Sequence, residues 1–87
     1  MKYMIIERFR DANAVYARLD SKGRQLPAGL EYIDSWVSQD ATHCYQLMEA
    51  QDPSLLTQWI DAWKDIVDFE VVPVVSSAEA RARANPT

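Results

Sequence analysis

The sequence predicts an α+β domain in which two helices pack on one antiparallel sheet of four strands. Three observations lead to this prediction. Four segments are rich in β-forming residues and have the length of strands. Two amphipathic stretches separate the first segment from the second and the third from the fourth. A proline falls within the last segment, which suits the edge of a sheet. With 87 residues, 48% of them hydrophobic, the chain predicts a single domain over residues 1–87.

The first half of the domain begins with a strand over residues 2–9, a run of β-formers that is too short for a stable helix. Asp11 then provides the N-cap of a helix with an apolar stripe at helical spacing. Gly23 and the following residues 26–29 end this helix.

A β-hairpin is predicted for the middle of the chain. Residues 30–37 form its first strand, the polar residues 38–41 turn the chain, and residues 42–50 form its second strand.

The second helix starts at Asp52 and Pro53, an acidic N-cap followed by a proline at the first helical position. One wide apolar stripe follows at helical spacing: Leu55, Leu56, Trp59, Ile60, Trp63 and Ile66. We expect the two tryptophans to lie on one face of this helix, in the core or at a contact between subunits.

Residues 69–75 form the last strand, and Pro73 places it at an edge of the sheet or at a bulge. Ser76 with Glu79 fits a capping box for a short C-terminal helix, and residues 84–87 form a frayed tail. The order β-α-β-β-α-β with this extra helix is the ferredoxin-like motif.

In that topology the helices cover one face of the sheet and leave the other face open. The predicted strands carry apolar side chains on both faces, and a chain of this size has a small core. We therefore expect the open face to pack on the sheet of a second copy, which gives a homodimer with a barrel between the two sheets.

The register of the hairpin decides which side chains reach the open face. We prefer the register with Trp36 opposite Cys44 and Asp34 opposite Gln46. It places the following apolar side chains under the helices: Ile33, Val37, Tyr45 and Leu47. A register shifted by one residue pairs Trp36 with His43 and mixes polar and apolar residues on both faces.

In the preferred register a candidate ligand site forms on the open face from Tyr32, Asp34, Trp36, Cys44, Gln46 and Met48. Glu7 joins this site if the odd positions of the first strand share the face, and Arg8 joins it if the even positions do. Two interpretations remain. A carboxylate near Trp36 and Met48 could act as a general base in a pocket. Alternatively, the apolar members form a dimer interface, with Asp34 and Gln46 hydrogen-bonded across it.

Charge and composition exclude several classes of protein. Nine Lys and Arg against 13 Asp and Glu give a net charge of −4, so the chain lacks the basic footprint of a nucleic-acid-binding protein. The apolar runs are far shorter than the ~20 residues that cross a bilayer, so we expect no membrane partner. The single cysteine and the absence of a secretion signal favour the cytoplasm.

His43 and Cys44 are the residues that come closest to a metal or nucleophile site. They are adjacent on a predicted strand, so their side chains leave opposite faces and cannot share one ion or form a catalytic pair. His43 is best explained as a surface histidine beside a hairpin. The two glycines form no phosphate-binding loop. We therefore expect no metal and no cofactor.

Four strings, at residues 6–9 (IERF), 34–37 (DSWV), 44–49 (CYQLME) and 68–74 (DFEVVPV), are similar to those of a small, mostly bacterial family. That family is known as a domain of unknown function within the dimeric α/β-barrel superfamily, and the similarity extends from about residue 3 to residue 79. The resemblance implies a ferredoxin-like protomer that dimerises through its sheet. It implies no activity, and it assigns no catalytic residue.

These observations predict a dimeric protein that binds a small molecule between its two sheets. An alternative is a cofactor-independent monooxygenase or isomerase that acts on a small aromatic or polyketide-like compound. A third hypothesis is a transient protein-interaction module, because basic residues gather in the first part of the chain and acidic residues between positions 49 and 70.

Overall fold

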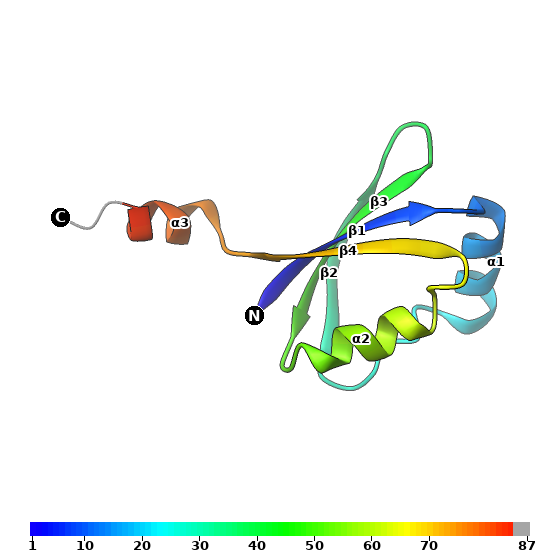
Figure 1. Ribbon diagram of the computed structural model, residues 1–87, viewed down its shortest axis with the longest axis horizontal. Coiled ribbons are helices and arrows are strands. Elements are labelled where there is room, and N and C mark those ends of the chain that lie inside the picture. Colours follow the sequence, from blue (N-terminus) through cyan, green and yellow to red (C-terminus); the bar gives the residue numbers. More distant parts are fainter. Residues whose placement is uncertain (85–87) are drawn as a thin grey trace.

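The computed structural model describes residues 1–84, so three residues of the predicted frayed tail lie outside the described part. Its elements are β1 (Lys2–Phe9), α1 (Ala12–Lys22), β2 (Leu30–Val37), β3 (His43–Ala50), α2 (Ser54–Asp61), β4 (Val67–Val74) and α3 (Ser77–Ala84) (Figure 1). This order confirms the predicted α+β arrangement with an extra terminal helix, and it is consistent with a ferredoxin-like fold.

The four strands form one antiparallel sheet in the order β2-β3-β1-β4. β1 and β3 are therefore the central strands, and β4 lies at an edge, as Pro73 predicted. In the sheet β3 separates β1 from β2, and β1 separates β3 from β4. The helices α1 and α2 therefore lie in the two crossover connections, from β1 to β2 and from β3 to β4.

The predicted caps of α1 are confirmed. The Asp11 carboxylate accepts a hydrogen bond from the Ala14 backbone N–H at 3.1 Å. At the other end Gly23 has a φ of 66°, in the left-handed region that glycine adopts without strain, and its N–H donates to the Leu19 carbonyl at 2.8 Å.

The second helix is shorter than its apolar stripe predicted. Its start also differs by one residue, because Pro53 and not Asp52 is the N-cap, and no side chain caps the helix. The Asp52 carboxylate accepts a hydrogen bond from the Ser54 N–H at 2.9 Å just before the helix, and α2 ends at Asp61. Beyond Asp61 the chain tightens into turns, with the Ala62 N–H bonded to the Trp59 carbonyl, so that it can reverse into β4. Trp63 therefore lies beyond the helix, although its side chain is buried in the same core as that of Trp59.

Both helices pack on one face of the sheet. The core cluster combines Val15 from α1 and Leu56 and Trp59 from α2 with residues from all four strands. On this covered face the odd positions of β1 and the even positions of β3 are buried, namely Tyr3, Ile5, Glu7, Cys44, Gln46, Met48 and Ala50. The opposite face, which we call the open face, carries the alternate residues.

The register predicted for the β2–β3 hairpin is wrong in its outer half. Trp36 pairs with Tyr45 and Val37 with Cys44, whereas Tyr32 pairs with Met48 as that register requires. A bulge at Ile33 separates the two halves of the ladder. The extra residue reverses the alternation of β2 beyond Tyr32.

The bulge separates residues that were expected to share one face. Cys44, Gln46 and Met48 lie on the covered face, while Asp34 and Trp36 lie on the open face together with Tyr45 and Leu47. The prediction that Tyr45, Leu47 and Ile33 lie under the helices is therefore wrong, and that for Val37 is confirmed by its pairing with the buried Cys44. Without the bulge, strict alternation from Leu30 and Tyr32 would have turned Asp34 and Trp36 inward.

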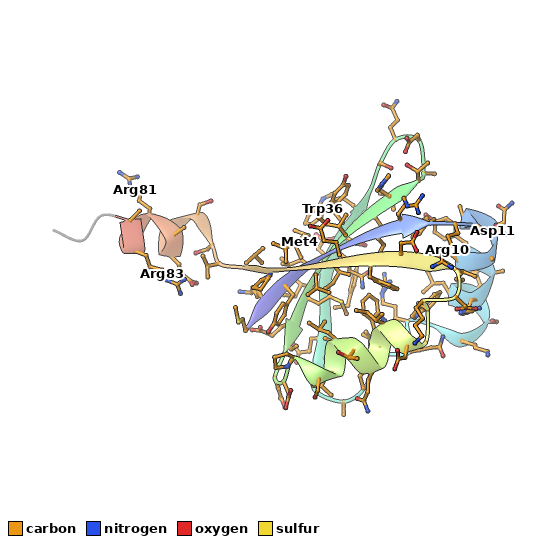
Figure 2. The ribbon with its side chains drawn as sticks, in the orientation of Figure 1. Met4, Arg10, Asp11, Trp36, Arg81 and Arg83 are labelled. Atoms are coloured by element: carbon orange, nitrogen blue, oxygen red, sulfur yellow. The ribbon has the colours of Figure 1, made fainter. Side chains whose placement is uncertain are left out.

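The open face is partly apolar and uncovered. Trp36 is 54% exposed and Tyr45 is 40% exposed. Met4 of β1 pairs with Leu47 of β3 on this face, and Figure 2 shows Met4 and Trp36 on the side of the sheet away from α2.

The terminal helix α3 extends away from the rest of the molecule (Figure 1), and none of its residues is buried. Its predicted N-cap is confirmed, because the Glu79 N–H donates to the Ser76 hydroxyl at 3.1 Å. Arg81 and Arg83 project from α3 into solvent (Figure 2). Within residues 1–84 no helix is long and apolar enough to cross a membrane.

Candidate functional site

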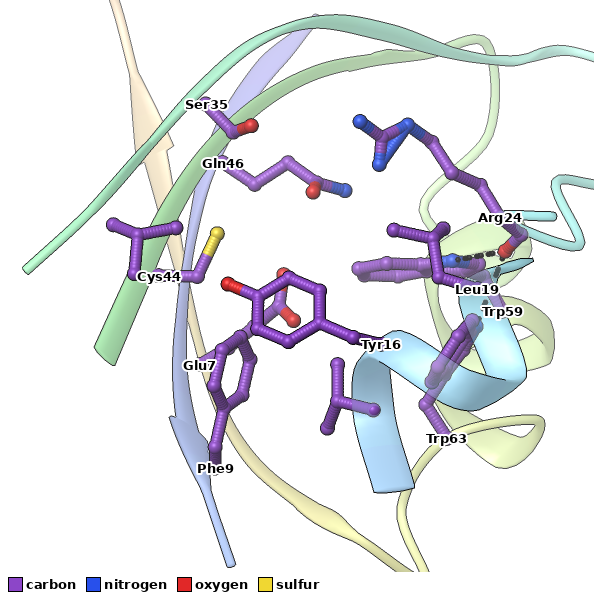
Figure 3. Close-up of a pocket in the computed structure, with 12 residues that line it drawn as sticks. Glu7, Phe9, Tyr16, Leu19, Arg24, Ser35, Cys44, Gln46, Trp59 and Trp63 are labelled. Carbon is purple, nitrogen blue, oxygen red and sulfur yellow. Dashed lines mark hydrogen bonds between the residues drawn. The ribbon is translucent and has the colours of Figure 1, made fainter. Parts of the chain in front are cut away.

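A cavity of about 110 Å³ lies between the covered face of the sheet and the helices (Figure 3). The strands contribute Glu7, Phe9, Ser35, Val37, Cys44 and Gln46 to its walls. The helices and the segments that follow them contribute Val15, Tyr16, Leu19, Arg24, Trp59 and Trp63. Its walls are mostly apolar and aromatic, with a few polar groups, which is the usual composition of a small-ligand pocket.

Glu7 is the buried acid of this cavity. Its odd position on the central strand β1 turns it to the covered face, opposite Cys44 on β3 and Phe69 on β4. The residue is only 7% exposed, and its Oε2 has no hydrogen-bond partner among the described residues. Burial raises the pKa of Glu7 to about 7, against the opposing effect of the Arg24 charge. Glu7 is therefore present in both its neutral and its ionised form near neutral pH.

Arg24 brings a positive charge to the same cavity from the segment between α1 and β2. Its backbone carbonyl accepts two indole hydrogen bonds, from Trp59 at 3.0 Å and from Trp63 at 3.1 Å (Figure 3). Its guanidinium lies over the ring of Tyr32, 3.7 Å from the ring centroid. No carboxylate of the described residues forms a salt bridge with this guanidinium.

The other polar groups around the cavity are neutral. Gln46 is 4% exposed, and its amide donates to the sulfur of Met48 at 3.3 Å. Ser35 and Tyr32 share a hydrogen bond of 2.7 Å between their hydroxyls. Burial, with the nearby Glu7 charge, raises the pKa of the Cys44 thiol to about 11. Because the thiolate is the reactive form of cysteine, this raised pKa keeps Cys44 in its thiol form at neutral pH.

The structure divides the candidate residues of the sequence analysis into two groups. Glu7, Cys44 and Gln46 line the cavity, with Met48 buried beside Gln46 and Tyr32 in contact with Arg24. Asp34 and Trp36 are on the open face, so the predicted single site does not form.

Sequence reasoning assigned only three of the wall residues to a site and missed the other nine: Phe9, Val15, Tyr16, Leu19, Arg24, Ser35, Val37, Trp59 and Trp63. It also assigned Trp59 to core or subunit contact alone. One signal was available: an acidic residue, Glu7, stands in a row of alternate positions with Tyr3 and Ile5, and charged side chains in buried rows are rare unless they serve a site.

His43 and Cys44 point to opposite faces of β3, as predicted, and the His43 ring nitrogen Nδ1 lies 2.8 Å from the Thr42 hydroxyl. Within residues 1–84 no group of three or more His, Cys, Asp or Glu side chains is arranged to hold a metal ion.

Comparison with known proteins gives one match. The family model described as "Domain of unknown function (DUF3303)" matches residues 1–87, the full length of the chain. No curated protein and no solved structure matches the chain.

The raised pKa of Glu7 predicts an unusual dependence of stability on pH. Because the acid form is favoured in the folded state, its contribution to stability is complete below the unfolded pKa near 4.5 and declines as the pH rises through about 7. We expect the free energy of unfolding to fall by about 2 to 3 kcal/mol between pH ~5 and ~8 from this group. Urea denaturation at each pH measures the effect.

The Glu7→Gln variant should lose this dependence, since its amide does not titrate. Glu70→Gln, an exposed acid on the adjacent strand β4, is the matched control and should follow the wild-type curve. Parallel curves for the wild type and Glu7→Gln would show that Glu7 is not a buried titrating group.

Proposed function

We propose that this chain, which belongs to the DUF3303 family, is a small-molecule-binding protein whose ligand occupies the cavity between the sheet and the helices. The observation that carries the proposal is the buried, unpartnered Oε2 of Glu7 in a mostly apolar cavity. A buried polar atom without a partner costs about 1 to 3 kcal/mol, and a ligand that supplies the partner removes this cost.

The volume of the cavity limits the size of the ligand. An apolar cavity of roughly 150 Å³ accommodates benzene, so about 110 Å³ fits a smaller ring or a short unsaturated chain. Tyr16 and Val37, which are 42% and 45% exposed, contribute to the walls and connect the cavity to solvent. This location differs from the site between two sheets that the sequence suggested.

Filling the cavity should abolish binding without unfolding the protein. The Cys44 side chain points into the cavity (Figure 3), so Cys44→Leu places additional apolar atoms in empty space. We expect Cys44→Leu to weaken the binding of single-ring fragments at least tenfold and to unfold at a higher temperature than the wild type.

The indole N–H signals of Trp59 and Trp63 in a nitrogen-proton NMR spectrum report ligand entry, because both indoles line the cavity. Cys44→Ala is the matched control, since it keeps the cavity open and should bind as the wild type does. Equal binding by Cys44→Leu and Cys44→Ala would place the ligand elsewhere. A broad fragment set that leaves both indole signals unchanged would contradict the proposed function itself.

A second function, that of a cofactor-independent isomerase, is favoured by the pKa of Glu7 near 7. A group with this pKa both accepts and returns a proton at neutral pH, as a general acid–base catalyst does. The Glu7 carboxylate would take a proton from the carbon next to a carbonyl, and the electron pair of the broken C–H bond would move to the carbonyl oxygen near Arg24. Glu7 would then return the proton to a different carbon.

The conversion of 3-cyclopentenone to its conjugated isomer tests this step, because the product absorbs in the ultraviolet. We expect the wild type to accelerate the reaction and Glu7→Gln to lose at least a hundredfold in rate. Glu70→Gln should keep the wild-type rate. If Glu7→Gln and the wild type convert the ketone equally, the isomerase function is wrong.

We also propose that two copies of the chain associate through the open face. Trp36 and Tyr45 expose large apolar surfaces there, and Ile6 of the central strand β1 pairs with Tyr45. The face carries both signs of charge, with Arg8 on β1 and Asp34 on β2, so a twofold axis can bring opposite charges together across an interface.

A charge at an exposed tryptophan of this face should weaken the dimer. We expect the wild type to be a dimer at micromolar concentration in light scattering, and Trp36→Glu to weaken association by about 2 kcal/mol or more, since a tryptophan buried in an interface is often a hot spot. Val71→Glu changes an exposed apolar residue on the other face and should leave the dimer intact. A monomeric wild type would contradict the proposal.

A further inference from the structure

We infer that the ligand of this cavity is a small unsaturated carboxylic acid, bound as its anion with the carboxylate at Arg24 and the apolar body against the indoles. This inference rests on the proposed function and names its ligand class. Three features of the cavity lead to it, namely a guanidinium without a salt bridge, apolar aromatic walls and a buried carboxyl group that can take up a proton.

Arg24 is the cationic side chain of the cavity wall, and its charge is free for a ligand. The other described arginines of the domain body behave differently: Arg18 binds Asp65 at 2.7 Å, and Arg8 and Arg10 both bind Asp68. The stacking of Arg24 on Tyr32 holds the guanidinium in place while leaving its N–H donors unused by the described carboxylates. A guanidinium in this state is suited to bind a carboxylate through two parallel hydrogen bonds.

The walls beyond Arg24 select the rest of the ligand. Trp59 and Trp63 are fixed by their hydrogen bonds to the Arg24 carbonyl, so both indoles have fixed positions relative to that residue. Leu19 and Phe9 complete an apolar surface around the same space. A flat, apolar body attached to a carboxylate matches this arrangement of charge and wall.

Glu7 would oppose an anion if it were ionised, so binding must favour its neutral form. The groups that face Glu7 are Arg24 from the α1–β2 segment, the neutral Cys44 thiol on β3 and the Tyr16 phenol on α1. β4 presents Phe69 and α2 presents Trp59, neither of which titrates. A neutral Glu7 also donates a hydrogen bond to the ligand. Acid binding is therefore coupled to the uptake of a proton by Glu7.

Three furans that share one ring but differ in charge test the inference: furan-2-carboxylate, furan-2-carboxamide and furfurylamine. Their five-membered ring is smaller than benzene and suits the cavity, and their substituent would lie at the half-buried Arg24. Titration calorimetry at pH 6 and pH 8 measures the affinity of each for the full chain. We expect the carboxylate to bind most tightly, and about tenfold more tightly at pH 6 than at pH 8, given a pKa of about 7 for Glu7. Calorimetry in buffers of different ionisation enthalpy should show proton uptake.

Variants at the two charged positions separate their roles. Arg24→Gln should weaken the carboxylate at least tenfold and leave the carboxamide unchanged, and Arg24→Lys should restore part of the loss. Glu7→Gln should keep binding the carboxylate with the same affinity at both pH values. A structural role for either residue would change all three furans alike.

Tighter binding of furfurylamine, or affinity for the carboxylate that rises with pH, would overturn the inference and leave small-molecule binding in place, because an amine requires ionised Glu7. Loss of the proposed function has a different signature. In that case neither the furans nor a broader fragment set would shift the indole signals of Trp59 and Trp63.

Discussion

The Arg24 carbonyl, which accepts a hydrogen bond from each of two indoles, is the interaction on which the cavity depends. It joins the segment between α1 and β2 to the segment around the end of α2, which are 35 and 39 residues apart in the chain. Both indoles are buried, so each N–H needs a partner, and losing one would leave an unsatisfied donor at about 1 to 3 kcal/mol. The guanidinium of the same residue lies over Tyr32, and its positive charge lowers the pKa of Glu7 against the larger effect of burial.

The second constraint is the position of Glu7 on a central strand. β1 is hydrogen-bonded on both sides, to β3 and β4, so its backbone cannot turn to release a side chain into solvent. The Glu7 carboxyl group loses hydration at this buried position, and no salt bridge to a described residue compensates for the loss. Burial therefore raises its pKa. Glu7 is therefore an acid with a pKa of about 7 that lines the cavity, where its Oε2 has no hydrogen-bond partner among the described residues.

The sequence predicted the elements of the fold well because their signals are local. Asp11, Gly23 and Pro73 each act through the backbone within a few residues, and each is found where the pattern placed it. The bulge at Ile33 has no such signal, since β2 contains no glycine or proline. Nothing in its residue pattern shows where the side chains stop alternating between the two faces of the sheet. That single residue divided the predicted site, so the composition of a face was harder to predict than the order of strands. The contact of Arg24 with the tryptophans is equally invisible, because only the packing of α2 brings them together.

The alternation of the strands connects the two proposed sites of the molecule without joining them. Ile6 and Glu7 are neighbours in β1, yet one belongs to the open face and the other to the cavity. A second copy that covers the open face would therefore add no side chain to the cavity, which lies on the other side of the sheet. It would instead protect the hydrogen-bonded ladders of β1 and β3, the strands that hold Glu7, Cys44 and Gln46 in register. In a small domain with a marginal core, association would stabilise the sheet and so hold the side chains of the ligand site in position. The affinity for a charged ligand would depend on Glu7 and Arg24 and not on the second copy.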